Sequence, residues 1–128
     1  MKGGFRLRVI AKDGTVSNGP QMTATDFGGG GNGVKRIAVP LAPGVLAEDI
    51  AKITFDAYDD DGIYFMGIGD VFVPKLKGDN GATLEYVNKG FKPANVYVDD
   101  DDSGCVGGKN TKDGASYPCV GSAFTLTL

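Results

Sequence analysis

The chain has 128 residues, with 13 lysines and arginines against 16 aspartates and glutamates, which gives a formal net charge of −3. An acidic chain without a basic patch repels phosphate backbones, so nucleic acid is not an expected partner. No stretch approaches the roughly 20 apolar residues that cross a bilayer, so membrane insertion is not expected either. The length supports one hydrophobic core, and we predict a single domain over residues 1–128.

Glycine accounts for 21 of the 128 residues and gathers between short segments in which apolar and polar residues alternate. Alternation of this kind between glycine-rich turns is typical of antiparallel strands. In chain order, the pattern predicts strands over residues 5–11, 20–26, 34–41, 51–58, 67–74, 82–87, 94–99 and 122–128.

Segment 51–58 has the clearest two-residue period. We predict that its apolar side chains point into the core and that the alternating ones point outward; the inward set is Ile53, Phe55 and Ala57, and the outward set is Thr54, Asp56 and Tyr58.

Residues 43–52 break the strand pattern. They place helix formers after Pro43 and predict one or two helical turns, with Leu46 and Ile50 on the same side. The remainder predicts an all-β fold: an antiparallel β-sandwich or jelly roll of about eight strands with one short helical turn.

The two cysteines, Cys105 and Cys119, enclose a loop rich in glycine, lysine and asparagine that has little apolar surface. A disulfide across it would stabilise the fold by roughly 3 kcal/mol on the loop-entropy model. We therefore predict a bridge, with two unpaired thiols as the alternative, and an extracellular or particle-surface location. A metal site on these cysteines is disfavoured because the chain has no histidine.

Two acidic runs stand out, at residues 59–61 before Gly62 and at residues 99–102. Crowded carboxylates repel one another unless they stay hydrated or a cation neutralises them, and calcium prefers such oxygen ligands. The alternative is a pair of solvated loop tips or an interface charge patch. The predicted calcium ligands are Asp56, Asp59, Asp61, Asp99, Asp101 and Ser103.

The second run matches the first half of a helix-loop-helix calcium loop. Asp99, Asp101 and Ser103 occupy its positions 1, 3 and 5, and Gly104 its position 6, but position 12 is Asn110 where that loop requires glutamate. We therefore exclude a helix-loop-helix site and retain a β-sandwich loop that shares ligands with a second loop.

Residues 34–74 resemble the closing half of galactose-binding-like jelly rolls found in carbohydrate-binding modules. The resemblance implies a β-sandwich scaffold and a sugar ligand, although this chain contains no tryptophan to stack on one. The matching residues are Val39, Pro40 and Leu41; Ile50, Lys52, Ile53 and Phe55; and Ile68, Asp70, Val71 and Val73.

Residues 58–74 are also similar to the third calcium loop of C2 domains, with Tyr58, Asp59 and Asp61 before the strand. Gly67 stands where that family would place a further acidic ligand. This second resemblance likewise implies a β-sandwich with oxygen-rich loops.

An enzyme is not expected, because a chain without histidine lacks the usual proton carrier near neutral pH. Tyrosine rings can stack on sugars or anchor protein contacts, and we select Tyr58, Tyr64 and Tyr97 as candidate ligand-binding residues. The alternative for Tyr97 is a half-buried strand residue.

These observations predict a noncatalytic, calcium-dependent module that binds a glycan or a protein surface. The alternative is a structural subunit of an extracellular filament, surface layer or virion, in which the sandwich assembles as a homo-oligomer, filament or shell.

Overall fold

The computed structural model describes residues 4–23, 36–58, 62–74, 84–99, 105–112 and 114–128. Within these ranges the chain forms ten strands and one short 3₁₀ helix, Ala47–Asp49, so the predicted all-β class is confirmed. The strands are β1 (Phe5–Ala11), β2 (Val16–Asn18), β3 (Ile50–Ala57), β4 (Gly62–Ile68), β5 (Val71–Pro74), β6 (Leu84–Asn88), β7 (Lys92–Asp99), β8 (Lys109–Lys112), β9 (Ala115–Pro118) and β10 (Ala123–Thr127).

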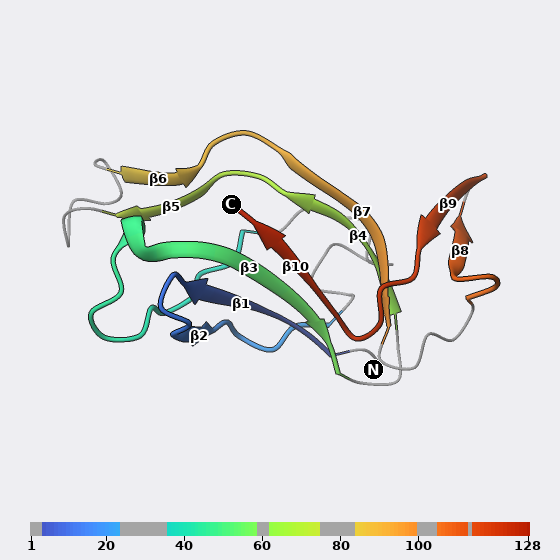
Figure 1. The fold of residues 1–128 in the computed structure, drawn as a ribbon, viewed down its shortest axis with the longest axis horizontal. Coiled ribbons are helices and arrows are strands. Elements are labelled where there is room, and N and C mark those ends of the chain that lie inside the picture. The colour runs from blue at the N-terminus through green and yellow to red at the C-terminus, as the bar shows by residue number, and fades with distance from the viewer. Residues whose placement is uncertain (1–3, 24–35, 59–61, 75–83, 100–104, 113) are drawn as a thin grey trace.

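The largest sheet has four antiparallel strands in the order β10-β3-β1-β2 (Figure 1). Its two central strands, β3 and β1, are the ones with the clearest alternation. Each has a neighbouring strand on both edges, so its side chains pack against cross-strand neighbours on both sides. Leu7 lies opposite Phe55, and Ile53 lies opposite Leu126.

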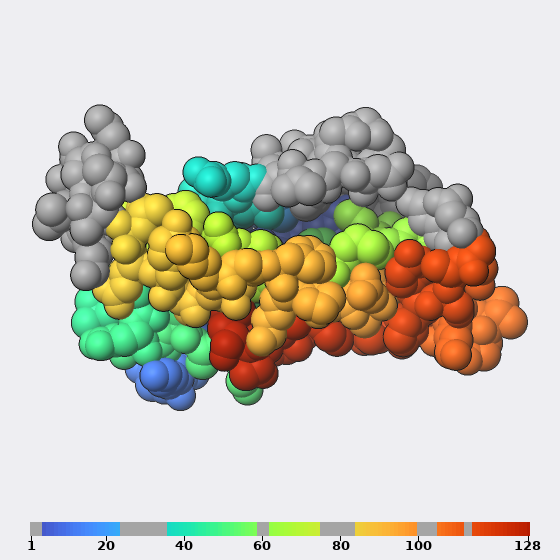
Figure 2. All heavy atoms as spheres, turned by 90° about the horizontal axis from the view of Figure 1, so that it is seen from above, coloured from blue at the N-terminus to red at the C-terminus, as the bar shows by residue number. Residues whose placement is uncertain are grey.

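The second layer is a long two-stranded ribbon. β4 pairs with β7 and β5 pairs with β6, so residues 62–74 and 84–99 run antiparallel along most of the molecule (Figure 1). The ladder is interrupted between its two halves, where the Asp70 carboxylate accepts the Gly90 N–H at 2.6 Å. Seen from above, β6 and β7 run along the molecule and the red atoms of β10 lie along one rim (Figure 2).

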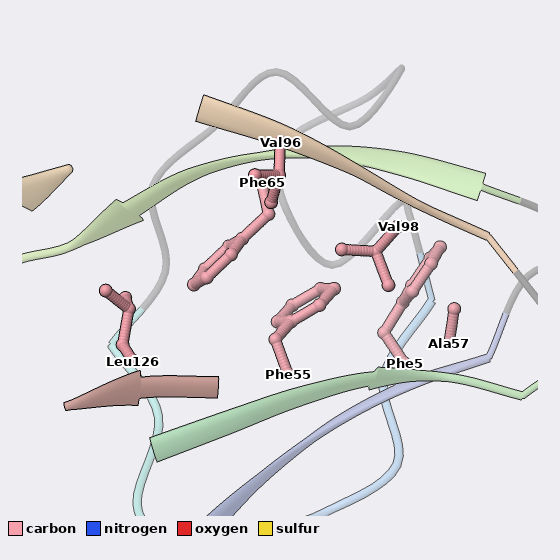
Figure 3. Close-up of a cluster of buried hydrophobic side chains, with 7 residues drawn as sticks. All are labelled: Phe5, Phe55, Ala57, Phe65, Val96, Val98 and Leu126. Carbon is pink, nitrogen blue, oxygen red and sulfur yellow. The ribbon is translucent and has the colours of Figure 1, made fainter. Parts of the chain in front are cut away.

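The core lies between the sheet and the ribbon (Figure 3). The Phe55 ring stacks on Phe65 of the ribbon, with ring centroids 4.5 Å apart, and on Phe5 of the same sheet at 5.8 Å. The buried cluster comprises Phe5, Phe55, Ala57, Phe65, Val96, Val98 and Leu126. This packing supports two facing layers, while the finer expectation of a jelly roll stays a prediction.

The predicted faces of β3 are confirmed for its apolar side, since Ile53, Phe55 and Ala57 are all buried. The opposite face differs from the expectation: Thr54 and Asp56 point away from the core yet are only 3% and 8% exposed. Neighbouring side chains of β1 and β10 cover them, because β3 is flanked by a strand on each edge.

Other boundaries also differ from the expectation. In the described parts of segments 20–26 and 34–41 there is only an isolated bridge, Phe5 to Met22, and the rest of both segments lies outside the described residues. Segment 67–74 divides between β4 and β5, and β2, β8 and β9 were not predicted.

The helical turn is shorter than predicted. It is a single 3₁₀ turn, begun by the Leu46 N–H donating to the Asp49 carboxylate at 2.9 Å, and the chain then enters β3. Leu46 is therefore 57% exposed while Ile50 is 7% exposed, so the two do not share a side. Within the described ranges no helix is long and apolar enough to cross a membrane.

Phe55→Ala should lower the free energy of unfolding by about 3 to 5 kcal/mol, because it removes the ring on which both layers pack. Phe91→Ala is the matched control: Phe91 is 66% exposed, and its loss should change stability by no more than about 0.5 kcal/mol. Urea unfolding of both variants measures the difference. Equal losses would contradict the placement of the core.

Candidate binding site at the acidic end of the ribbon

The ribbon pairs the two described residues that adjoin the acidic runs of the sequence. Gly62, the first residue of β4, lies directly opposite Asp99, the last residue of β7. Paired residues in an antiparallel ladder have Cα atoms about 4.5 to 5.5 Å apart. Residues 59–61 end, and residues 100–102 begin, at these two adjacent positions, although both segments lie outside the described residues. The two positions at which these runs join the described chain therefore lie side by side at one end of the ribbon.

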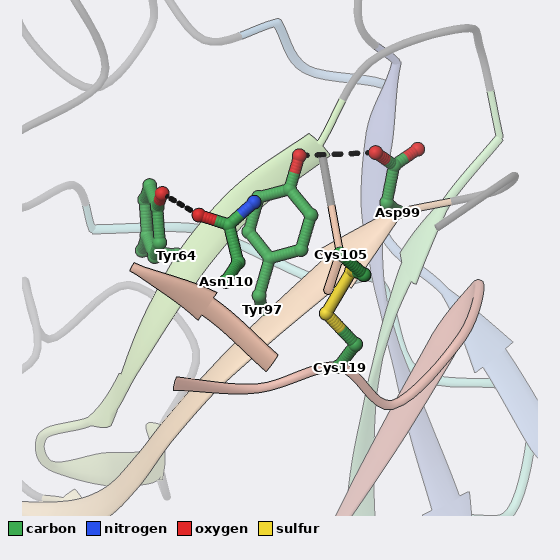
Figure 4. The surroundings of a disulfide bond; sticks show 6 residues. All are labelled: Tyr64, Tyr97, Asp99, Cys105, Asn110 and Cys119. Atoms are coloured by element: carbon green, nitrogen blue, oxygen red, sulfur yellow. Dashed lines mark hydrogen bonds between the residues drawn. A yellow bond between two sulfur atoms is a disulfide. The ribbon is translucent and has the colours of Figure 1, made fainter. Parts of the chain in front are cut away.

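Asp99 lies at the base of this end and is fully buried, at 0% exposure. The Tyr97 hydroxyl donates a hydrogen bond to its Oδ2 at 3.0 Å (Figure 4). The Asp99 backbone N–H donates to the Gly121 carbonyl at 3.0 Å, which ties the end of β7 to the chain that leads into β10. A buried carboxylate is costly unless polar partners compensate for lost water, and the Tyr97 hydroxyl is one such partner of the Asp99 side chain.

Glycine is needed at position 62 because the Tyr97 ring crosses over it. A Cβ added to Gly62 would overlap the Tyr97 hydroxyl and would lie 2.8 Å from Asp99 Oδ2. The hydroxyl can reach the carboxylate only because position 62 has no side chain. The sequence marks this residue as a turn glycine, whereas the structure uses it as a close-approach position.

Two of the predicted ligand-binding tyrosines form part of an internal cluster. The Tyr64 ring lies 5.0 Å from Tyr97 and 5.1 Å from Tyr117, centroid to centroid. Its hydroxyl donates to Asn110 Oδ1, as Figure 4 shows. Tyr97 is only 8% exposed. These rings therefore pack the β8–β9 hairpin against the ribbon.

Tyr58, the third predicted ligand-binding tyrosine, is different. It is 40% exposed and directly precedes the first acidic run. One side of its ring covers Gly4, where an added Cβ would overlap the ring, and the Arg6 guanidinium lies 6.0 Å from the ring centroid. Tyr58 is thus the aromatic residue of the predicted set with substantial exposed surface at this end.

The predicted disulfide between Cys105 and Cys119 is present. It closes a segment expected as a loop but found as the β8–β9 hairpin, which projects from the body of the molecule (Figure 1). The segment begins with a tight turn in which Gly107 and Gly108 have positive φ angles of 61° and 80°. This turn joins Val106 to Lys109, which exchange backbone hydrogen bonds, and adjacent glycines are typical of such two-residue turns.

Asp56 is neutralised by two arginines of the neighbouring strand β1. Arg8 Nη2 donates to Asp56 Oδ1 at 3.1 Å. Two ion pairs reach Asp56 Oδ2, from Arg8 Nε at 2.6 Å and from Arg6 Nη2 at 3.7 Å. A carboxylate held by two guanidinium groups needs no metal ion to balance it. We therefore leave Asp56 out of the ligand set proposed below.

The remaining predicted ligands, Asp59, Asp61, Asp101 and Ser103, lie outside the described residues. Among the residues that are described, no three acidic, cysteine or histidine side chains gather as a metal-binding group. Two open hollows border residues 43–49. One of about 200 Å³ lies against residues 11–15, and one of about 360 Å³ lies against Val73, Pro74 and Glu85 at the other end of the ribbon.

Comparison of this chain with protein-family models, curated proteins and solved structures found no match. The arguments that follow therefore rest on the described geometry and on the sequence.

Gly62→Ala should destabilise the fold by about 1 to 3 kcal/mol, because the new methyl group displaces the Tyr97 hydroxyl from Asp99. Gly69→Ala is the matched control in the same ribbon, since a Cβ there meets nothing within 4 Å. Chemical unfolding of both variants gives the comparison. A Gly62→Ala protein as stable as the Gly69→Ala protein would contradict the close approach.

Proposed function

We propose that this chain is a noncatalytic, calcium-dependent binding module whose ion site lies at the acidic end of the ribbon. The observation that carries the proposal is the pairing of Gly62 with Asp99, because the first acidic run ends and the second begins at these adjacent backbone positions. The proposed ligands are Asp59, Asp61, Asp99, Asp101 and Ser103.

The physical reason for a cation is charge repulsion. Two carboxylates about 5 Å apart repel by about 1 to 3 kcal/mol at effective dielectric constants between those of water and a protein surface. Six aspartates lie in residues 59–61 and 100–102, and Asp99 adds a fully buried seventh. Calcium accepts six to eight oxygen ligands in flexible geometry, so it suits a site assembled from two loops.

A glycan is the proposed ligand, bound beside the ion with the exposed Tyr58 ring as the stacking surface. Tyrosine offers an apolar ring face together with a hydroxyl that remains hydrated. Tyr64 and Tyr97 would act indirectly, by fixing the hairpin and the buried Asp99 beneath the site. The absence of histidine from the chain supports binding without catalysis. The disulfide supports an oxidising, extracellular or particle-surface setting.

Calcium should raise the melting temperature, and a chelator should lower it, because an ion that binds only the folded state stabilises it. The gain is about 2.7 kcal/mol at an ion concentration one hundred times the dissociation constant. The double variant Asp59→Asn/Asp101→Asn should lose most of this gain. Calorimetry with calcium, and with magnesium at the same ionic strength, measures the effect.

Glu48→Gln is a control: it removes an exposed negative charge at the other end of the ribbon and should keep the full calcium response. An unchanged melting temperature in calcium and chelator would refute the ion site. A response equal for calcium and magnesium, and equal in both variants, would show diffuse screening instead of a site.

A structural subunit of a filament, surface layer or virion is the second candidate. It is favoured by Val106, which is 83% exposed at the start of the projecting hairpin, and by Phe91, which is 66% exposed. Apolar side chains so exposed are suited to contacts between subunits. Electron microscopy of concentrated protein separates the two: ordered filaments or shells support assembly, whereas dispersed particles support the binding module.

A further inference from the structure

The last strand, β10, is an edge of the four-stranded sheet, and its hydrogen-bonding directions follow from its ladder with β3. The Ala57 N–H donates to the Ser122 carbonyl at 2.7 Å, and the Leu128 N–H donates to the Ala51 carbonyl at 2.9 Å. Even-numbered residues of this strand therefore face β3. Because backbone groups alternate along an antiparallel strand, the N–H and C=O groups of Ala123, Thr125 and Thr127 point away from the sheet.

This outer edge is open. Ala123, Thr125 and Thr127 are all exposed, and β10 lies along the rim of the molecule in Figure 2. Within the part of the chain that the structure describes, no backbone hydrogen bond reaches these three residues from outside β3. Six backbone hydrogen-bonding groups in a row are thus presented to solvent, which is a template for another strand.

Several other strand edges carry features that discourage pairing. β2 has three residues and is followed by Gly19 and Pro20, and proline lacks an N–H. The β4–β7 ladder has an irregularity between Phe65 and Gly67. In contrast, β10 has the sequence AFTLT, with five uncharged residues and no proline, and its ladder with β3 has no register shift.

We propose that β10 pairs with β10 of a second copy of this chain. The two strands would run antiparallel about a two-fold axis at Thr125, joining two four-stranded sheets into one of eight strands. In this register Thr125 faces Thr125 of the second copy, and Ala123 faces Thr127 of the second copy. All three outward residues of each strand then make hydrogen-bonded pairs, giving six backbone hydrogen bonds.

Charge and shape favour a second copy as the occupant. The chain has a net charge of −3, but β10 itself has none, so self-pairing brings no like charges into contact at the edge. On the core side, the half-buried Phe124 comes next to Leu126 of the second copy, which extends the apolar layer across the axis. The pairing is isologous and uses both free edges, so it closes at a dimer.

The expected association is weak. Interfaces carry about one hydrogen bond per 100 to 200 Å², so six bonds correspond to roughly 600 to 1,200 Å² of buried surface. That is the size of transient complexes, and we expect a dimer that dissociates on dilution through the micromolar range. The proposed interface contains no proposed calcium ligand, so a result against the dimer would not count against the ion site, nor the reverse.

Sedimentation of paired charge variants tests the proposal. Thr125→Lys and Thr125→Glu each place two like charges across the axis, and each should be monomeric at concentrations where the unchanged chain dimerises. An equimolar mixture of the two should dimerise again. Thr125→Val is the matched control: it loses the contact between the Thr125 and Thr54 hydroxyls, 3.0 Å apart, but keeps the edge neutral and should still dimerise.

A cysteine pair tests the register. Thr125→Cys should cross-link to a dimer under mild oxidation, because facing Cα atoms about 5.5 Å apart suit a disulfide. Ala123→Cys should not, since the two copies of residue 123 would be four positions, or roughly 13 Å, apart along the strands. Melting temperatures confirm that each variant is folded.

The proposal is overturned if the unchanged chain stays monomeric at millimolar concentration, if the Lys/Glu mixture remains monomeric, or if both cysteine variants cross-link equally.

Discussion

Stacking of three phenylalanine rings is the interaction on which this structure depends. Phe5 and Phe55 belong to the four-stranded sheet, Phe65 belongs to the ribbon, and Phe55 contacts both of the others. Two separate layers of short strands have few other ways to hold a fixed orientation, because each strand pair alone is marginally stable in water. By fixing the ribbon over the sheet, the rings also fix the position of the ribbon end at which Gly62 pairs with Asp99.

The position of Gly62 opposite Asp99 follows from that placement. In the same ladder Tyr64 lies opposite Tyr97, so the tyrosine pair and the glycine–aspartate pair occupy one face of the ribbon. Tyr97 can then extend over Gly62 to Asp99, while Tyr64 and Tyr117 hold the disulfide-closed hairpin. The acidic end is thus built on a rigid, packed base, which is the arrangement that a binding site on loops requires.

The chain handles its carboxylates in distinct ways. Arg8 and Arg6 balance Asp56 on the outer face of the sheet. The Tyr97 hydroxyl donates to the Asp99 carboxylate where the ribbon ends, and the Gly121 carbonyl accepts the Asp99 backbone N–H. The aspartates of residues 59–61 and 100–102 are the ones for which calcium is proposed. Strand β10 has no charged side chain, and this neutral edge supports the self-pairing proposed there.

Local patterns in the sequence determined the all-β class, the strands β1, β3, β7 and β10 to within about two residues, and the cysteine pair, because alternation and turn residues act over a few neighbours. They did not predict that Asp56 would be neutralised by arginines, that Tyr97 would be buried, or that the cysteine-closed segment would form a hairpin. Those outcomes depend on which residue faces which across strands separated by tens of positions. Cross-strand register is set by packing of the whole core, so only the tertiary structure could decide them.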